Sequence, residues 1–210
     1  MSIASEKGGR VESKLQNRSI VSPLRIDAVT VPETGGLIGM TICPGKDEYA
    51  GLGIPAGPWK RDLELDLQVI RDWQAQALVT LIEVFEFELL SVPEFPEKAR
   101  ELGIRWFHLP IVDVWIPDKV FEEDWGRAGE ELRQILREGG RIVVHCRGGL
   151  GRTGLVAARL LIEFGMAPQE AIRRVRAARP GAIQTKEQEN YVRRCAMSSA
   201  ERLPSQEEWE

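Results

Sequence analysis

The sequence predicts an α/β protein in which a central, mostly parallel sheet is flanked by helices. Two observations favour this class. Short apolar segments of strand length alternate along the chain with segments of helical periodicity, and no internal repeat interrupts this order. Such alternation is typical of strands that lie side by side and are connected by helices. In sheets of this kind, ligands bind beyond the carboxyl ends of the strands.

The first half of the chain contains four expected elements. An apolar run at 36–43, followed by a loop rich in glycine and proline, predicts the first strand. Apolar residues at helical spacing predict a helix over 61–76. A second apolar run at 77–85 predicts the second strand. Proline near the start and glycine at the end predict a short helix over 95–103.

The second half continues the alternation. An apolar run at 104–113 predicts the third strand, and a long charged segment closed by two glycines predicts a helix over 118–138. The fourth strand is expected at 141–145. Three further helices are expected over 152–164, 168–179 and 186–196. The first ends at a glycine, and the second begins with a proline and ends before another. The third is the last segment of helical pattern before the polar C-terminal residues.

Both ends of the chain differ in composition from the segment between them. Residues 1–22 and 197–210 are polar and charged, so we expect two mobile tails. No linker divides residues 23–196, and we therefore expect one domain there.

Composition excludes several classes of protein. The chain has 210 residues, 43% of them hydrophobic, and a formal net charge of −4, which gives no argument for nucleic acid as a partner. We expect no membrane anchor, because no apolar run approaches spanning length. Three widely spaced cysteines and two histidines form no metal-ligand pattern and no disulfide framework, so we expect no metal, no cofactor and a cytoplasmic location. The oligomeric state is left open.

The strongest signal is the stretch VVHCRGGLGRTG at 143–154. It runs from an apolar strand through a glycine-rich turn into a helix, an arrangement that aims backbone N–H groups and a helix N-terminus at one point. We expect that point to bind a phosphate. The residues expected to hold the phosphate are Arg147, Gly148, Gly149, Leu150, Gly151 and Arg152.

Cys146 is the expected nucleophile of this stretch. Loop dipoles, the helix end and Arg152 favour a thiolate there, and a thiolate within a phosphate site is placed for in-line attack on phosphorus. Thr153 is expected to bring a hydroxyl near the sulfur. His145 is expected to orient the loop rather than to act as a base.

The segment HCRGGLGRTG resembles the His-Cys-x2-Gly-x2-Arg-Ser/Thr signature of the cysteine-dependent tyrosine and dual-specificity protein phosphatases. Together with LPIVDVWIPD and PGAIQTKEQENYV, it is similar to the kinase-associated (cyclin-dependent kinase inhibitor 3-like) subfamily. The resemblance covers approximately residues 36–195. It implies a dual-specificity phosphatase-like sheet ringed by helices, a phosphocysteine intermediate and no metal.

Two aspartates compete for the role of general acid. Asp113 follows the third predicted strand and opens a loop, and the resemblance implies an acid at this point. Asp118 belongs to a Trp-Ile-Pro-Asp sequence that imitates the Trp-Pro-Asp triplet of the classical tyrosine phosphatases, but it also suits the cap of the following helix. We favour Asp113 and keep Asp118 as the alternative.

Other residues have weaker predicted roles. The resemblance implies that a glutamine positions the attacking water, with Gln184 preferred; Gln188 is equally well a solvated residue at a helix start. Cys43 is expected at the same end of the sheet as Cys146. The basic run at 173–179 is expected to be a solvated helix face, with support of the loop from behind by Arg179 as the alternative. Trp59, Lys60 and Trp115 are expected to border the pocket.

The sequence therefore predicts a phosphatase acting on phosphotyrosine in a phosphorylated protein or peptide, with phosphoserine and phosphothreonine as further candidate substrates. Three alternatives remain at this point. The site could cleave a non-protein phosphoester such as a phosphoinositide, could bind a phosphorylated ligand without turnover, or could transfer sulfur through a persulfide. The lack of lysine in the loop disfavours a phosphoinositide, and Asp113 disfavours sulfur transfer.

Overall fold

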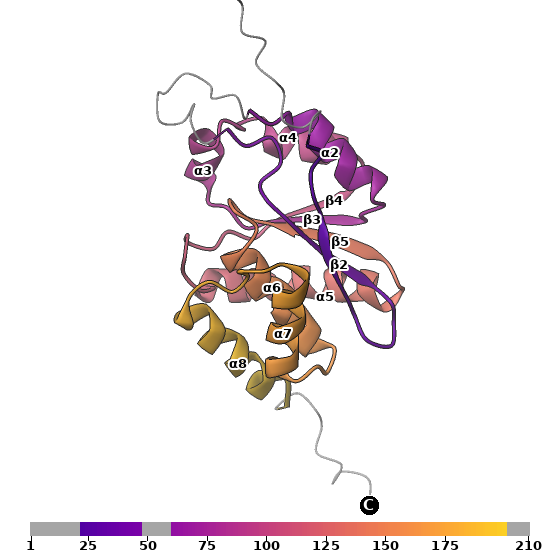
Figure 1. Ribbon diagram of the computed structural model, residues 1–210, viewed down its shortest axis with the longest axis vertical. Coiled ribbons are helices and arrows are strands. Elements are labelled where there is room, and N and C mark those ends of the chain that lie inside the picture. Colours follow the sequence, from indigo (N-terminus) through magenta and orange to yellow (C-terminus); the bar gives the residue numbers. More distant parts are fainter. Residues whose placement is uncertain (1–21, 48–59, 201–210) are drawn as a thin grey trace, which may run out of the picture.

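The computed structural model describes residues 22–47 and 60–200. The predicted N-terminal tail, 1–22, lies almost entirely outside these ranges, as does residue Trp59. Of the predicted C-terminal tail, 197–210, the structure describes the first four residues. Figure 1 shows the ribbon of the described part.

Five strands form one sheet in the order β1-β2-β5-β3-β4. Their bounds are Asp27–Thr30 (β1), Leu37–Thr41 (β2), Ala77–Thr80 (β3), Arg105–His108 (β4) and Arg141–His145 (β5). β1 is antiparallel to β2, whereas β2, β3, β4 and β5 run parallel. The expected α/β class with a mostly parallel sheet is confirmed.

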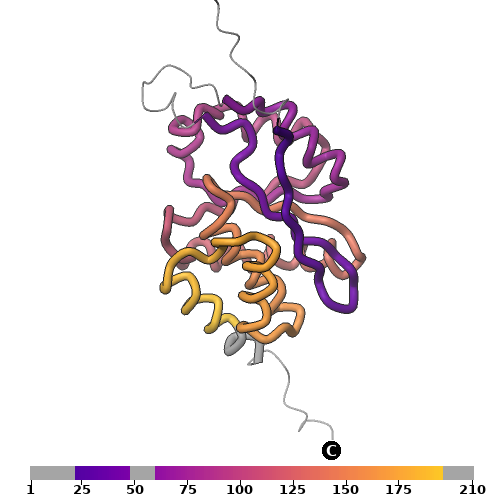
Figure 2. The backbone as a smooth tube through the Cα atoms, viewed as in Figure 1, coloured from indigo at the N-terminus to yellow at the C-terminus, as the bar shows by residue number. Residues whose placement is uncertain are grey.

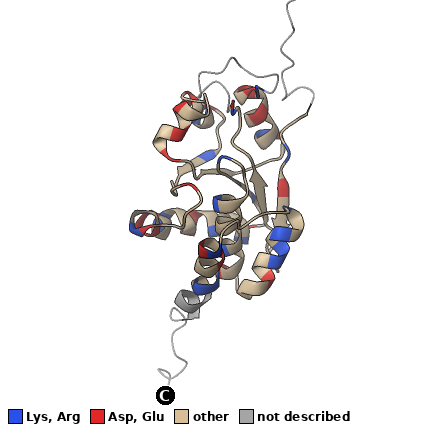
Figure 3. Ribbon diagram, turned by 60° about the vertical axis from the view of Figure 1, so that its left-hand side comes forward, with Lys and Arg blue, Asp and Glu red and all other residues tan. Residues whose placement is uncertain are grey.

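Seven helices of the described residues cover the two faces of the sheet (Figure 1). Their bounds are Leu63–Asp72 (α2), Val84–Leu89 (α3), Phe95–Glu101 (α4), Lys119–Arg137 (α5), Gly151–Glu163 (α6), Pro168–Ala178 (α7) and Lys186–Ala200 (α8). Helices α2, α3 and α4 lie on one side of the sheet and α5 to α8 on the other, which the tube in Figure 2 shows as a purple-to-magenta and a pink-to-yellow layer. Figure 3 shows basic and acidic residues interspersed over these helices.

The structure departs from the predicted elements at several segments. The expected strand at 77–85 ends at Thr80, and its last two residues belong to α3, which begins with a capping box between Glu83 and Glu86. The expected strand at 104–113 ends at His108. Helix α8 continues through Ala200, into the segment assigned to the C-terminal tail, because no proline follows until Pro204.

Strand β5 lies at the centre of the sheet and positions the predicted loop. Its sequence RIVVH is buried from Ile142 to His145, as expected for a strand covered on both faces. His145 pairs with Thr41 of β2 and with Thr80 of β3. The chain therefore leaves the sheet at Cys146, at the carboxyl ends of three parallel strands.

Candidate active site

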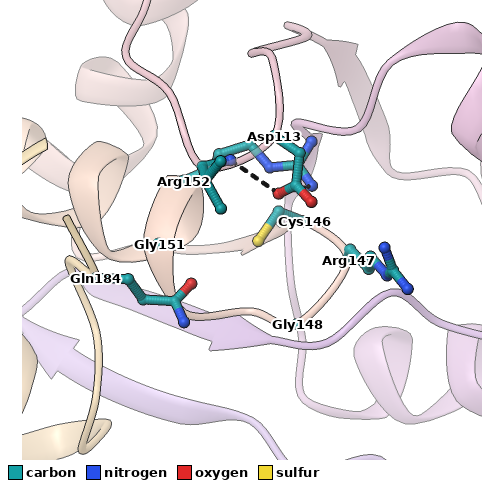
Figure 4. A pocket seen from close by; sticks show the side chains of 8 residues that line it. Asp113, Cys146, Arg147, Gly148, Gly151, Arg152 and Gln184 are labelled. Atoms are coloured by element: carbon teal, nitrogen blue, oxygen red, sulfur yellow. Dashed lines mark hydrogen bonds and ion pairs between the residues drawn. The ribbon is translucent and has the colours of Figure 1, made fainter. Parts of the chain in front are cut away.

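A cavity of about 250 Å³ lies where β5 passes into α6. Its lining comes from separate parts of the chain: the β5–α6 loop, helix α6, the loop after β4 and the loop before α8 (Figure 4). The lining residues are Asp113, Val114, Cys146, Arg147, Gly148, Gly151, Arg152 and Gln184. The fold therefore brings together the thiol, the arginine, the preferred acid and the preferred glutamine that the sequence singled out.

The β5–α6 loop turns its backbone amides toward one side. The carbonyl of Arg147 accepts a hydrogen bond from Cys43 N, at 3.3 Å, and the carbonyl of Leu150 accepts from Gly154 N, at 2.9 Å. The carbonyls of Gly148 and Gly149 both accept hydrogen bonds from the Arg179 guanidinium. Because a trans peptide directs its N–H opposite to its C=O, the following amides point away from these partners. This is the arrangement that an anion-binding loop requires.

Arg179 and Gly149 fix the shape of the loop from behind. Arg179 is nearly buried and forms an ion pair with Asp27 of β1, at 2.7 Å. Gly149 has a φ of +66°, and a Cβ at this position would lie 2.2 Å from the Thr41 carbonyl oxygen. Glycine is therefore required at residue 149. The alternative prediction for Arg179, support of the loop from behind, is confirmed.

Arg152 is held by a buried carboxylate. Its guanidinium contacts Glu86 of α3 through two nitrogen–oxygen pairs, at 2.6 and 3.0 Å, and donates to the Ile111 carbonyl at 3.0 Å. Arg152 is 1% exposed and Glu86 is 2% exposed. Burial lowers the pKa of Arg152, but hydrogen bonding to Glu86 and the charges around it outweigh this effect and raise that pKa above its usual value. The guanidinium is thus charged and fixed in orientation.

Two buried polar atoms at the start of α6 have no hydrogen-bond partner within residues 22–47 and 60–200. They are Arg152 Nε and Thr153 Oγ1. A buried polar atom without a partner is costly, and Arg152 also lines the cavity. A tetrahedral oxyanion bound there would supply an acceptor to the guanidinium.

His145 is buried beneath the loop and is neutral. The Trp106 indole donates to Thr80 Oγ1, at 2.9 Å, which leaves the threonine hydroxyl to donate to His145 Nε2, at 2.8 Å. The other ring nitrogen, Nδ1, faces the Cys146 carbonyl at 3.4 Å, so we assign the proton to Nδ1. Burial, aided by the charge of Arg152, lowers the pKa of His145 to about 3.

The low pKa of His145 predicts a loss of stability in acid. Below the ordinary pKa of 6.5 the unfolded chain binds a proton on this ring, whereas the folded chain does not until about pH 3. Stability therefore falls with decreasing pH across this window, by up to about 1.4 kcal/mol per pH unit from this group. We expect the free energy of unfolding of His145→Gln to depend less steeply on pH between 6 and 4 than that of the parent. Equal slopes in urea titrations would contradict this account.

The two candidate acids occupy different environments. Asp113 lines the cavity, and its carboxylate lies 2.8 Å from Arg152 Nη2 with 47% of the side chain exposed. Asp118 is the N-cap of α5, and its carboxylate accepts from Phe121 N at 2.8 Å. The helix-capping interpretation of Asp118 is confirmed, and Asp118 does not line the cavity.

The two candidate glutamines also occupy different environments. Gln184 lines the cavity, next to Gly151. Gln188 is fully buried, accepts from Gln184 N at 3.0 Å and donates to the Trp115 carbonyl at 3.0 Å. The interpretation of Gln188 as a solvated residue is therefore wrong, because the loop after β4 covers it. Gln188 ties that loop to the start of α8.

Some predicted residues do not line the cavity. Gly149 and Leu150 are behind it, where their peptide groups shape the loop, while Thr153 and His145 are buried.

The three cysteines of the chain are free thiols, and burial raises the pKa of the Cys43 thiol.

Glu86 is the residue that sequence reasoning missed. The signal was available in part, since Glu83-x-x-Glu86 is a capping-box spacing that overlaps the end of the strand predicted at 77–85. Within the described ranges no cluster of side chains has the make-up of a metal site, and none of the helices there is long and apolar enough to cross a membrane.

The sequence resembles known phosphatases over most of its length. The family described as "Swiss Army Knife protein, DSP-PTPase phosphatase domain" matches residues 78–192. Cyclin-dependent kinase inhibitor 3 of Rattus norvegicus is 31% identical over 175 residues, which cover 82% of this chain and 76% of the rat protein. Tyrosine-protein phosphatase CDC14 of Saccharomyces cerevisiae is 36% identical over 85 residues, which cover 40% of this chain and 15% of the yeast protein.

Solved structures agree with the sequence comparison. Kinase-associated phosphatase, with its catalytic-site cysteine replaced by serine, superimposes with a TM-score of 0.72 at 27% identity, covering 85% of this chain and 97% of that one. Tk-PTP in its active form gives a TM-score of 0.59 at 25% identity, covering 81% and 97%. The family match at 78–192 includes every residue that lines the cavity.

Proposed function

This chain belongs to the DSP-PTPase family of dual-specificity and tyrosine phosphatases, and on that basis we propose that it hydrolyses phosphorylated proteins through a phosphocysteine intermediate on Cys146. One observation carries the proposal. Cys146 and Arg152 of the β5–α6 unit and Asp113 of the loop after β4, which are remote from each other in the sequence, line one cavity. That kinase-associated phosphatase has a catalytic-site cysteine supports the role of Cys146.

In the first half-reaction, the amides of the β5–α6 loop and the Arg152 fork hold the phosphate group of the substrate. Cys146 Sγ attacks phosphorus, an S–P bond forms and the P–O bond to the substrate breaks. The Asp113 carboxyl group gives its proton to the leaving oxygen. Because the Asp113 side chain is half-exposed, it is free to turn from Arg152 toward that oxygen.

In the second half-reaction, water attacks the phosphocysteine. Asp113, now a carboxylate, takes the proton from the water, the S–P bond breaks and inorganic phosphate leaves. Gln184, which also lines the cavity, orients the water, and Thr153 Oγ1, which has no partner in the described structure, donates to the departing sulfur. Arg152 stabilises the equatorial oxygens in both steps.

Initial rates on three substrate classes test this function. The panel comprises phosphotyrosine peptides, phosphothreonine peptides and a water-soluble phosphoinositide, with vanadate as inhibitor. We expect hydrolysis of phosphopeptides and inhibition by vanadate. Turnover of thiosulfate without hydrolysis of any phosphoester would overturn the proposal in favour of sulfur transfer, and tight binding of phosphopeptide without turnover would favour an adaptor.

The general acid is tested by a matched pair of variants. We expect Asp113→Asn to lower kcat by about 100-fold on aryl phosphates, within the range for removal of a general acid, and the loss should grow as the leaving phenol becomes more basic. Asp118→Asn should leave kcat nearly unchanged and should change the free energy of unfolding little, because asparagine caps the N-terminus of a helix about as well as aspartate does. A larger kinetic loss in the second variant would assign the acid to Asp118.

We also propose a cytoplasmic location and phosphorylated proteins as partners. Three free thiols support a reducing compartment. The names of the relatives, which refer to a cyclin-dependent kinase and to phosphotyrosine, support a phosphoprotein substrate.

A further inference from the structure

Exposed apolar side chains gather on two segments of the molecule. Of the seven large apolar residues that are exposed in the described part of the chain, five belong to α3 or to the loop after β4. They are Val84, Phe85, Val112, Val114 and Trp115. We call these five residues the apolar rim. Exposed apolar patches of this kind mark interaction sites more often than isolated surface residues do.

Both segments of the rim border Arg152. Helix α3 carries Glu86, which contacts the guanidinium at 2.6 Å, directly after Val84 and Phe85. The loop after β4 contributes the Ile111 carbonyl, at 3.0 Å, and the Asp113 carboxylate, at 2.8 Å. The two apolar groups are thus attached to the two segments that hold the phosphate-binding arginine, and Val114 lines the cavity itself.

In the loop after β4, hydrogen bonds fix the backbone although the apolar side chains are exposed. Trp115 N donates to the Val112 carbonyl at 3.0 Å, and the Trp115 carbonyl accepts from the buried Gln188. Val114 has a φ of +55°, an uncommon conformation for a β-branched residue, and its N–H donates to the Asp113 carboxylate at 3.0 Å. Trp115 is 54% exposed and Phe85 is 61% exposed. A preorganised backbone that presents exposed apolar side chains is suited to binding a ligand with little loss of entropy.

Charge indicates the class of ligand. The exposed charged residues that lie within the two runs of rim residues or on α3 are acidic: Glu88 on α3 and Asp113 between Val112 and Val114. An anionic lipid surface would be repelled by these carboxylates. A polypeptide that carries apolar or basic side chains on either side of a phosphorylated residue would be complementary to them.

We propose that the apolar rim is a specificity surface that binds apolar side chains flanking the phosphorylated residue of a polypeptide substrate. This inference rests on the proposed function. Phosphate enters the cavity, while neighbouring substrate side chains pack on Trp115 and Phe85. Large aromatic residues are the ones that supply most binding energy at such surfaces.

The test compares two phosphotyrosine peptides that differ in their flanks, with leucine or with alanine on both sides of the phosphorylated residue. Each is assayed with the parent chain and with Trp115→Ala, Phe85→Ala and Leu65→Ala. Leu65 is the matched control, because it is an exposed apolar residue on α2, outside the two rim segments. A small aryl phosphate reports on the chemistry and on correct folding in every variant.

We expect the parent to prefer the leucine-flanked peptide by about tenfold in kcat/KM, and Trp115→Ala to remove most of this preference, as loss of a central aromatic contact does. Rates on the aryl phosphate should stay within about twofold for Trp115→Ala, Phe85→Ala and Leu65→Ala, since none of these side chains touches the reacting atoms. Equal rates on the two peptides, with the aryl phosphate still hydrolysed, would overturn the rim proposal and leave the phosphatase function intact. Preference for a phosphoinositide in anionic vesicles, abolished by Trp115→Ala, would instead assign the rim to a membrane and overturn it. Absence of aryl phosphatase activity in the parent would contradict the proposed function itself.

Discussion

Cys146→Ser is expected to lower kcat on a small aryl phosphate by more than about 10⁴-fold, the scale of loss when a covalent nucleophile is removed. Binding of the phosphate group should persist. The amides of the β5–α6 loop are held by Arg179 and by Cys43 N rather than by the sulfur, and Arg152 is held by Glu86. Calorimetry with tungstate should therefore give a Kd within about tenfold of the parent value.

Cys43→Ser is the matched control for this variant. Cys43 is also buried and lies against the same loop, through its backbone contact with Arg147, but it does not line the cavity. Its substitution should change kcat less than about threefold, because the loop is held by its backbone and not by the thiol. Substantial activity in Cys146→Ser, or equal losses in the two variants, would contradict the assignment of Cys146 as the nucleophile.

Arg152→Lys is expected to lower kcat/KM by about 10³-fold, although the positive charge is kept. A lysine ammonium cannot contact Glu86 through two nitrogens and at the same time offer a planar fork to the phosphate oxygens. The transition state carries more charge on those oxygens than the substrate does, so kcat should fall more than binding weakens. Steady-state kinetics on an aryl phosphate, with thermal unfolding in parallel, measure both effects.

Arg147→Lys provides the comparison for Arg152→Lys. Arg147 also lines the cavity, but it is only half-buried, whereas Arg152 is almost fully buried against Glu86. We expect kcat/KM of Arg147→Lys to fall by less than about tenfold, because a lysine can still supply a positive charge at that position. Similar losses for the two variants would mean that overall charge, rather than the fixed geometry of Arg152, governs the reaction.

The β5–α6 unit could be predicted from sequence because its chemistry is local. A buried strand, a glycine turn and a helix follow one another in the chain, and only five residues separate Cys146 from Arg152 within that unit. Gly149 could be identified for the same reason. The fold class followed from the alternation of apolar runs and helical periods, and both the class and the family are confirmed.

The elements that were missed depend on contacts between distant segments. Strand β1 has four residues, pairs only with β2 at an edge of the sheet and buries Val29 alone, so its sequence has little apolar pattern. The apolar run at 77–85 contains no glycine or proline to mark where β3 ends and α3 begins. Periodicity cannot separate a buried strand from a short helix in such a run.

The missed site contacts have the same origin. Glu86 is remote in sequence from Arg152, and its burial becomes visible only when α3 packs beside α6's first turn. Gln188 is polar and stands near a helix start, which favours a solvated position, but the loop after β4 covers it. Sequence spacing carries no information on either contact.

The central claim is that phosphate passes through a bond to Cys146. The most direct measurement is to quench the reaction with an aryl phosphate in acid within the first turnover, digest the chain and locate the phosphate by mass spectrometry. We expect phosphate on the peptide that contains Cys146, and more of it when Gln184→Ala slows the attack of water. Phosphate on another residue would contradict the claim. So would hydrolysis of the aryl phosphate without any phosphorylated peptide in the parent or in Gln184→Ala.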